Sequence, residues 1–126
     1  MPTRVGIDLI SVESVRDSIR AHDRRYLDRV YTQRELADCA TPGGVDSERL
    51  AARFAAKEAT MKVLRPGARG IAWSSIGVRR DPEGPVELEL SGAAAELAGD
   101  AGISSLALSL THDAGFAAAV VVAEMG

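Results

Sequence analysis

Apolar and polar side chains alternate along the first residues of the chain and then change to helical spacing. Over residues 3–10 every second side chain from Val5 to Leu9 is apolar, which predicts a strand with Asp8 near its end. Over residues 12–26 the apolar positions recur about one helical turn apart, which is typical of an amphipathic helix. The pattern therefore predicts a strand followed directly by a helix.

Two further helices are predicted before the middle of the chain. Thr32 and Glu35 have the spacing of a capping box, which predicts a short helix over about 33–40. The segment 48–65 is rich in strong helix formers and is followed by a proline and a glycine, which predicts a long helix that ends there. This long helix is apolar on two sides, so we expect it to be central.

The second half of the chain alternates between short strands and turns. It predicts strands at 76–78 and 86–90, a helix between Ser91 and Gly102, and strands at 106–110 and 116–123 joined by a loop over 111–115. Because hairpin-length connections join most strands, the sheet should be largely antiparallel. We therefore expect one α+β domain over residues 1–126, with a mostly antiparallel sheet packed on the long central helix.

Composition narrows the class of protein. The chain has 126 residues, a formal net charge of −3 and a pI near 5.4, and it lacks the strongly basic surface of a nucleic-acid-binding protein. No apolar run is long enough to cross a membrane, the first residues do not resemble a secretory signal, and the single cysteine excludes an internal disulfide framework. We expect a cytoplasmic protein that binds neither nucleic acid nor membrane.

Charged residues on the central helix are the first candidates for chemistry. Glu58 and Lys62 lie on the one stripe of this helix that is not apolar. There they could simply form a surface ion pair one turn apart. If the first strand packs beside this helix, however, Asp8 and Glu58 form a site with two carboxylates. Such a site suits Mg²⁺, which takes one or two carboxylates and completes its octahedron with phosphates and water.

Other basic residues could bind anions. The guanidinium of Arg53 can bind a phosphate with paired donors, although it could equally be an ordinary surface arginine. His112 lies in a predicted loop, where functional side chains are common but a solvated histidine is the simpler explanation. One cationic ridge, a stripe of the first predicted helix, could bind anionic ligands or merely be solvated. The ridge consists of Arg16, Arg20 and Arg24.

Three short motifs together resemble a known family. They are Gly6-Ile7-Asp8, Arg53-Phe54-Ala55-Ala56-Lys57-Glu58-Ala59 followed by Lys62, and Ser109-Leu110-Thr111-His112. Their order and separation are similar to those of holo-acyl-carrier-protein synthase, the small bacterial type of phosphopantetheinyl transferase. The resemblance covers essentially the whole chain, and the central motif is the specific one.

The resemblance implies a Mg²⁺-dependent transfer of the 4'-phosphopantetheine arm of coenzyme A to a serine of an apo acyl carrier protein, with release of adenosine 3',5'-bisphosphate. Asp8 and Glu58 would hold the metal, and together with Lys62 they would be the catalytic residues. Either Glu58 or a water on the metal would take the serine proton. The implied coenzyme A-binding residues are Arg53, Lys62, Ser109, Thr111 and His112.

The resemblance also implies a homotrimer with active sites between subunits, and an acidic carrier protein that would dock on the cationic ridge.

One departure from the family pattern concerns the turn at Gly84-Pro85, where the family commonly has a basic residue between glycine and proline. Either that basic contact is missing in this chain, or Arg79 or Arg80 replaces it. This altered turn is also the one feature that favours a binding module without turnover. A purely structural oligomer is the second alternative. The sequence leaves open which carrier protein is used and whether acyl-coenzyme A donors are accepted.

Overall fold

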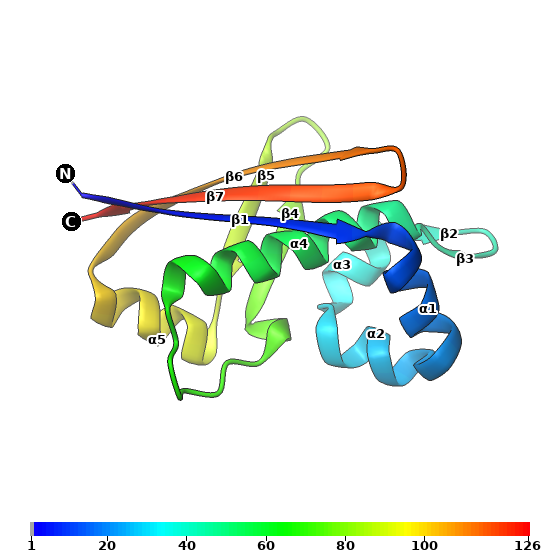
Figure 1. Ribbon diagram of the computed structural model, residues 1–126, viewed down its shortest axis with the longest axis horizontal. Coiled ribbons are helices and arrows are strands. Elements are labelled where there is room, and N and C mark those ends of the chain that lie inside the picture. Colours follow the sequence, from blue (N-terminus) through cyan, green and yellow to red (C-terminus); the bar gives the residue numbers. More distant parts are fainter. Residues whose placement is uncertain (1) are drawn as a thin grey trace.

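A three-stranded antiparallel sheet lies along one long helix (Figure 1). The computed structural model describes residues 2–126. The sheet has the order β1 (Thr3–Ser11), β7 (Phe116–Met125), β6 (Ile103–Asp113), and α4 (Ser47–Leu64) lies along one of its faces. A separate two-stranded sheet contains β4 (Ile76–Arg80) and β5 (Val86–Leu90). The expected α+β class, with an antiparallel sheet on a central helix, is confirmed.

Smaller elements gather at the two ends of α4 (Figure 1). Three helices lie near its N-terminal end: α1 (Val12–His22), α2 (Arg24–Val30) and α3 (Gln33–Asp38). A short hairpin of β2 (Ala40–Thr41) and β3 (Gly44–Val45) leads into α4, and α5 (Gly92–Ala101) lies near its other end. The short 3-10 helix η1 (Trp73–Ser75) precedes β4. No helix in residues 2–126 is both long and apolar enough to span a membrane.

The sequence of α4 explains its central place. Asp46 caps the helix by accepting hydrogen bonds from the backbone N–H groups of Glu48 and Arg49, and Arg65 ends it in a left-handed conformation with φ of 54°. Small alanines cover two sides of the helix, so the sheet and the α1–α3 helices approach it closely. The predicted two-sided burial is confirmed, and Glu58 and Lys62 lie on a stripe of α4 that stays partly accessible.

Gly6 sets the distance between β1 and α4. A Cβ at this position would lie 2.1 Å from the backbone oxygen of Ala59, closer than real atoms approach. We expect Gly6→Ala to lower the free energy of unfolding by about 2 kcal/mol, because β1 would have to move away from the helix. Urea unfolding measures this loss. Gly43→Ala is the matched control, since a Cβ there meets nothing within 4 Å; equal stabilities of the two variants would contradict the close approach.

Two predicted boundaries were wrong. The single helix expected over 12–26 is two helices, because Asp23 adopts a positive φ of 46° and turns the chain between α1 and α2. The loop expected over 111–115 is a tight turn at Ala114 and Gly115, so His112 lies in β6 opposite Ala117. His112 is therefore held by the sheet, not by a loop.

Candidate active site

Asp8, Glu58 and Lys62 meet where β1 crosses α4. The register of β1 with β7 places Asp8 on the inner face of the sheet, where 13% of its side chain is exposed. The Nζ of Lys62 lies 3.5 Å from Oδ1 of Asp8 and donates a 2.7 Å hydrogen bond to the backbone oxygen of Ile7. Lys62 forms its ion pair with Asp8 and not with Glu58, so the simple Glu58–Lys62 surface pair does not form. Strand and helix together bring two carboxylates and one ammonium group to one place.

Burial and the neighbouring Asp8 carboxylate both raise the pKa of Glu58, and Lys62 opposes them only in part. The raised pKa means that the ionised Glu58 is less favourable in the folded protein than in the unfolded chain. A divalent cation would remove this electrostatic cost, because its positive charge compensates both carboxylates. No group of three or more His, Cys, Asp or Glu side chains in residues 2–126 forms a metal site. A two-carboxylate site nevertheless fits Mg²⁺, whose remaining ligands are usually water and substrate phosphate.

We expect Glu58→Gln to raise the Tm of the metal-free protein, by a few degrees at most. At pH 7 the substitution removes a carboxylate with a raised pKa and gives Asp8 an amide donor. The gain should vanish below about pH 4, where Glu58 is protonated in both folded and unfolded states. Thermal melts in EDTA across this pH range test it. A Tm lower than that of the parent at pH 7 would show that the ionised Glu58 stabilises the fold.

A second group of basic residues lines a pocket of about 320 Å³ near the N-terminal half of α4. The Nδ1 of His112 lies 3.0 Å from Oε2 of Glu48 at this pocket. The pocket is lined by Arg49, Ala52, Arg53, Arg80, Leu110, Thr111 and His112. Arg80 was considered from the sequence only as a substitute for a missing basic residue, and the structure places it, together with Arg49, beside Arg53.

Arg53 is buried without enough hydrogen-bond acceptors. Only 2% of the residue is exposed, and its Nη1 donates to the backbone oxygen of Arg49 at 3.3 Å. Its Nε and Nη2 have no hydrogen-bond partner in the described structure. Because an unpaired buried guanidinium is costly, an anion in the pocket would supply the missing acceptors. The sequence alternative of an ordinary surface arginine is wrong.

The cluster of carboxylates and lysine at the crossing of β1 and α4 does not meet the arginine pocket within one chain. Arg53 lies five residues before Glu58, which is about 140° around the helix, so the two side chains leave α4 on different sides. Strand alternation places Ser109 and Thr111 on the outer face of the sheet, away from α4, although Thr111 also borders the arginine pocket. The structure thus brings Asp8 together with Glu58 and Lys62, and separately brings Arg53 together with Thr111 and His112.

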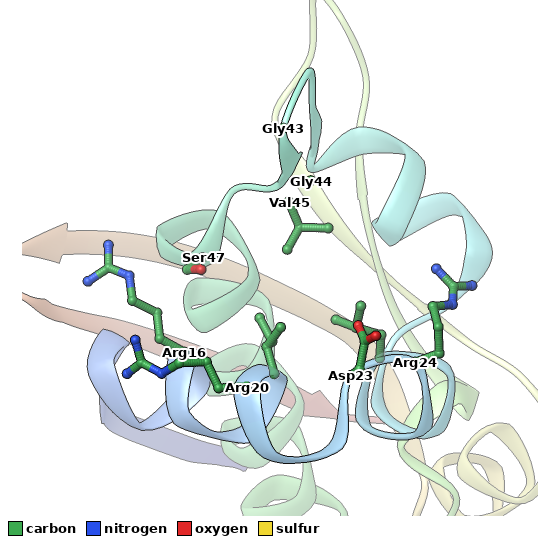
Figure 2. Close-up of a pocket in the computed structure, with 10 residues that line it drawn as sticks. Arg16, Arg20, Asp23, Arg24, Gly43, Gly44, Val45 and Ser47 are labelled. Carbon is green, nitrogen blue, oxygen red and sulfur yellow. The ribbon is translucent and has the colours of Figure 1, made fainter.

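The cationic ridge borders a different pocket, of about 540 Å³, between α1, α2 and the β2–β3 hairpin (Figure 2). Its arginines are paired within the chain. Arg16 contacts Glu13 at 3.5 Å, Arg20 contacts Glu13 and Asp17, and Arg24 contacts Asp28 at 2.7 Å. Apolar side chains of Ile19, Leu27 and Val45 line the pocket between them. The ridge therefore surrounds an apolar hollow but carries less free charge than its sequence indicates.

Sequence reasoning missed one fully buried ion pair. The Nζ of Lys57 lies 2.8 Å from Oε1 of Glu35 and also donates to the backbone oxygen of Trp73 at 3.2 Å. Glu35 completes the predicted capping box of α3, and its Oε2 accepts from the backbone N–H of Val78 at 2.9 Å. The one available signal was a lysine facing the apolar side of α4.

Comparison with known proteins identifies the family. Residues 4–121 match the model of the 4'-phosphopantetheinyl transferase superfamily. The chain is 44% identical to the holo-[acyl-carrier-protein] synthase of Chloroflexus aurantiacus, over 96% of this chain and 97% of the relative, and 38% identical to that of Halothermothrix orenii, over 97% of each. The chain therefore belongs to the holo-[acyl-carrier-protein] synthases of this superfamily. The family predicted from the three motifs is confirmed, and the chain is a phosphopantetheinyl transferase.

Solved structures agree with this assignment. The Helicobacter pylori holo-[acyl-carrier-protein] synthase in complex with coenzyme A matches with a TM-score of 0.81 and 31% identity, over 96% of this chain and all of that one. The Chronobacterium ammoniagenes ACPS-CoA complex matches with a TM-score of 0.84 and 28% identity, over 100% of this chain and 99% of that one. The antiparallel sheet on its central helix is thus a fold that this chain shares with both.

Proposed function

We propose that the protein transfers the 4'-phosphopantetheine arm of coenzyme A to a serine of an apo acyl carrier protein in a Mg²⁺-dependent reaction, releasing adenosine 3',5'-bisphosphate. The observation that carries the proposal is the meeting of Asp8, Glu58 and Lys62 at the crossing of β1 and α4. Two carboxylates can bind a metal ion, and the ammonium group beside them can bind the pyrophosphate that the metal also contacts. The relatives named above support coenzyme A as the donor and the carrier protein as the acceptor.

The residues have distinct roles in this reaction. Asp8 and Glu58 would hold Mg²⁺, which supplies charge neutralisation at the pyrophosphate when bound. Lys62 would contact the same phosphates through its remaining ammonium donors. The serine oxygen forms a bond to the phosphorus that carries the pantetheine arm, and the bond from that phosphorus to the bridging oxygen breaks. The departing nucleotide keeps the electron pair, and the serine proton leaves to a base, for which Glu58 is one candidate.

We place the nucleotide end of coenzyme A in the arginine pocket. Arg53 has two nitrogens that lack acceptors there, and His112 adds a ring that can donate once it leaves Glu48. Thr111 borders the same pocket, and Ser109 lies two residues before it on the outer face of β6. The release of adenosine 3',5'-bisphosphate from coenzyme A tests the function, measured by chromatography with apo carrier and Mg²⁺. Release that needs neither the carrier serine nor the metal would overturn the proposal.

We also propose a homotrimer whose active sites lie between subunits. The outer face of the sheet is apolar and exposed, with Val5 and Ile7 both 63% and Leu9 66% exposed and Phe116 48% exposed. Soluble monomers rarely expose such a continuous apolar surface. Since the metal-site group and the arginine pocket do not converge within one chain, each site would combine Asp8 of one subunit with Arg53 and His112 of its neighbour.

Mixing two inactive variants tests the shared sites. Neither Asp8→Ala nor Arg53→Gln should transfer alone, whereas a co-refolded equal mixture should recover about a quarter of the parent's specific activity. This fraction follows because one site in four combines an intact residue from each neighbour in a cyclic assembly. A mixture no more active than its two components would show that each site belongs to one chain.

Two further assignments stay predictions. An acidic carrier protein would dock on the ridge of Arg16, Arg20 and Arg24, where it would compete with the acidic residues that pair with these arginines. The apolar hollow beside the ridge would accept an apolar side chain of the carrier (Figure 2). A cytoplasmic location is the other prediction.

A further inference from the structure

Arg4 connects the two elements that carry the candidate active site. It lies in β1 four residues before Asp8, and strand alternation places both side chains on the face of β1 that is turned to α4. The Nη1 of Arg4 donates a 2.9 Å hydrogen bond to the backbone oxygen of Val63, which follows it by 59 residues and lies in α4. Arg4 forms no ion pair among residues 2–126. Its guanidinium therefore serves to join strand and helix.

The acceptor of this bond belongs to the last turn of α4. Carbonyl groups in the last four residues of a helix have no partner within the helix, and a cation is favourable at this end of the helix dipole. The backbone N–H of Arg65 donates to the oxygen of Met61 at 3.0 Å, and Arg4 supplies a donor for Val63. Lys62 lies between these two acceptors in the sequence. Arg4 thus stabilises the turn from which Lys62 projects.

Two side chains connect β1 and α4 in opposite directions. Arg4 reaches from the strand to the helix, whereas Lys62 reaches from the helix to the backbone oxygen of Ile7 at 2.7 Å. Between them lies Gly6, where a Cβ would collide with the backbone of Ala59. Lys62 has a second role in the proposed reaction, because it would also bind the pyrophosphate. Arg4 has no such role, so its bond can hold strand and helix together whether or not the substrate is present.

The distance between strand and helix also sets the distance between the two carboxylates, because Asp8 belongs to β1 and Glu58 to α4. We propose that Arg4 is a positioning residue for the metal site, an inference that rests on the proposed function: it keeps Asp8 and Glu58 at the spacing that Mg²⁺ requires. Without Arg4 only a fraction of the molecules has this spacing, so the apparent affinity for Mg²⁺ falls by that fraction. Saturating Mg²⁺ restores the site, and kcat is then unchanged.

Arg4→Met tests the inference, because it removes the donors and keeps an apolar stem. Mg²⁺ is titrated in two ways: through the rise in Tm of the protein with coenzyme A and without a carrier, and through transfer to an apo carrier protein. We expect the half-saturating Mg²⁺ concentration to rise about tenfold in both, the equivalent of one hydrogen bond from a charged group, with kcat at saturating Mg²⁺ within about twofold of the parent. Arg4→Lys keeps a cationic donor and should recover most of the loss.

Arg69→Met is the matched control. Arg69 follows α4 in the sequence, and its one ion pair is an exposed contact with Asp100 at 3.2 Å, so this variant should have the Mg²⁺ requirement of the parent. In EDTA, backbone amides in the last turn of α4 should exchange hydrogen several-fold faster in Arg4→Met than in Arg69→Met. Equal exchange in the two variants would overturn the inference, because the bond to Val63 would then stabilise nothing.

The two titrations separate this inference from the proposed function. A lower kcat for Arg4→Met with the Mg²⁺ requirement of the parent would show that Arg4 supports the fold alone, and would overturn its role at the metal site. A parent that transfers, with Arg4→Met unchanged in both titrations, would refute the role of Arg4 and leave the proposed reaction intact. A tenfold shift in the Tm titration without any transfer by the parent would refute the proposed reaction and support the role of Arg4.

Discussion

Replacing Asp8 with alanine should lower kcat/KM for transfer by roughly a thousandfold, the loss expected when a group that positions transition-state charge is removed from a site. The remaining Glu58 cannot hold a metal against the pyrophosphate by itself, and Lys62 loses one of the two contacts that orient its ammonium group. Transfer to an apo carrier protein, followed over a range of Mg²⁺ concentrations, measures the effect.

The control for this variant is Asp100→Ala, which removes an exposed carboxylate that pairs with Arg69 and lies outside the candidate site and the cationic ridge. It should leave transfer within about twofold of the parent, because an exposed ion pair contributes little. Circular dichroism should show that both variants are folded. Full activity of a folded Asp8→Ala protein would contradict the placement of the metal at the crossing of β1 and α4.

Replacing Lys57 with methionine should lower the free energy of unfolding by about 4 kcal/mol, because it leaves Glu35 as an uncompensated charge in the interior. Both side chains are fully buried, and Glu35 also anchors the backbone of Thr32 and Val78. Urea unfolding followed by the fluorescence of Trp73, the one tryptophan, measures the loss.

The double variant Glu35→Gln with Lys57→Met provides the control. It removes both charges and keeps an amide oxygen that can accept from a backbone N–H, so it should recover most of the lost stability. A single Lys57→Met variant that loses less than about 1 kcal/mol would contradict this account of the buried pair, because it would mean that Glu35 takes up a proton or reaches solvent at little cost.

Local patterns predicted most of the fold. The alternation in β1 and the helix formers of α4 were sufficient, because each element buries the face that its own period defines. The break at Asp23 was missed because a positive φ at a residue other than glycine has no strong local signal. Glu35 was recognised only as a capping residue, since its partner Lys57 is brought to it by tertiary packing.

Part of the candidate site was predicted from the sequence, and part depended on the tertiary structure. Asp8, Glu58 and Lys62 belong to two motifs, and one strand–helix crossing brings them together. The motif also joins Arg53 to Glu58 along the sequence, but the helix directs them apart. Whether Arg79 or Arg80 reaches the pocket depends on which face of β4 is buried, and this was settled only by the packing of the second sheet.

Intact mass spectrometry of an apo acyl carrier protein tests the central claim most directly. The carrier is incubated with this protein, coenzyme A and Mg²⁺, with parallel samples that contain EDTA or a carrier whose acceptor serine is alanine. We expect the carrier to gain the mass of one phosphopantetheine group only in the complete reaction. No gain with several apo carrier proteins, or the same gain in the presence of EDTA, would contradict metal-dependent phosphopantetheinyl transfer at Asp8 and Glu58.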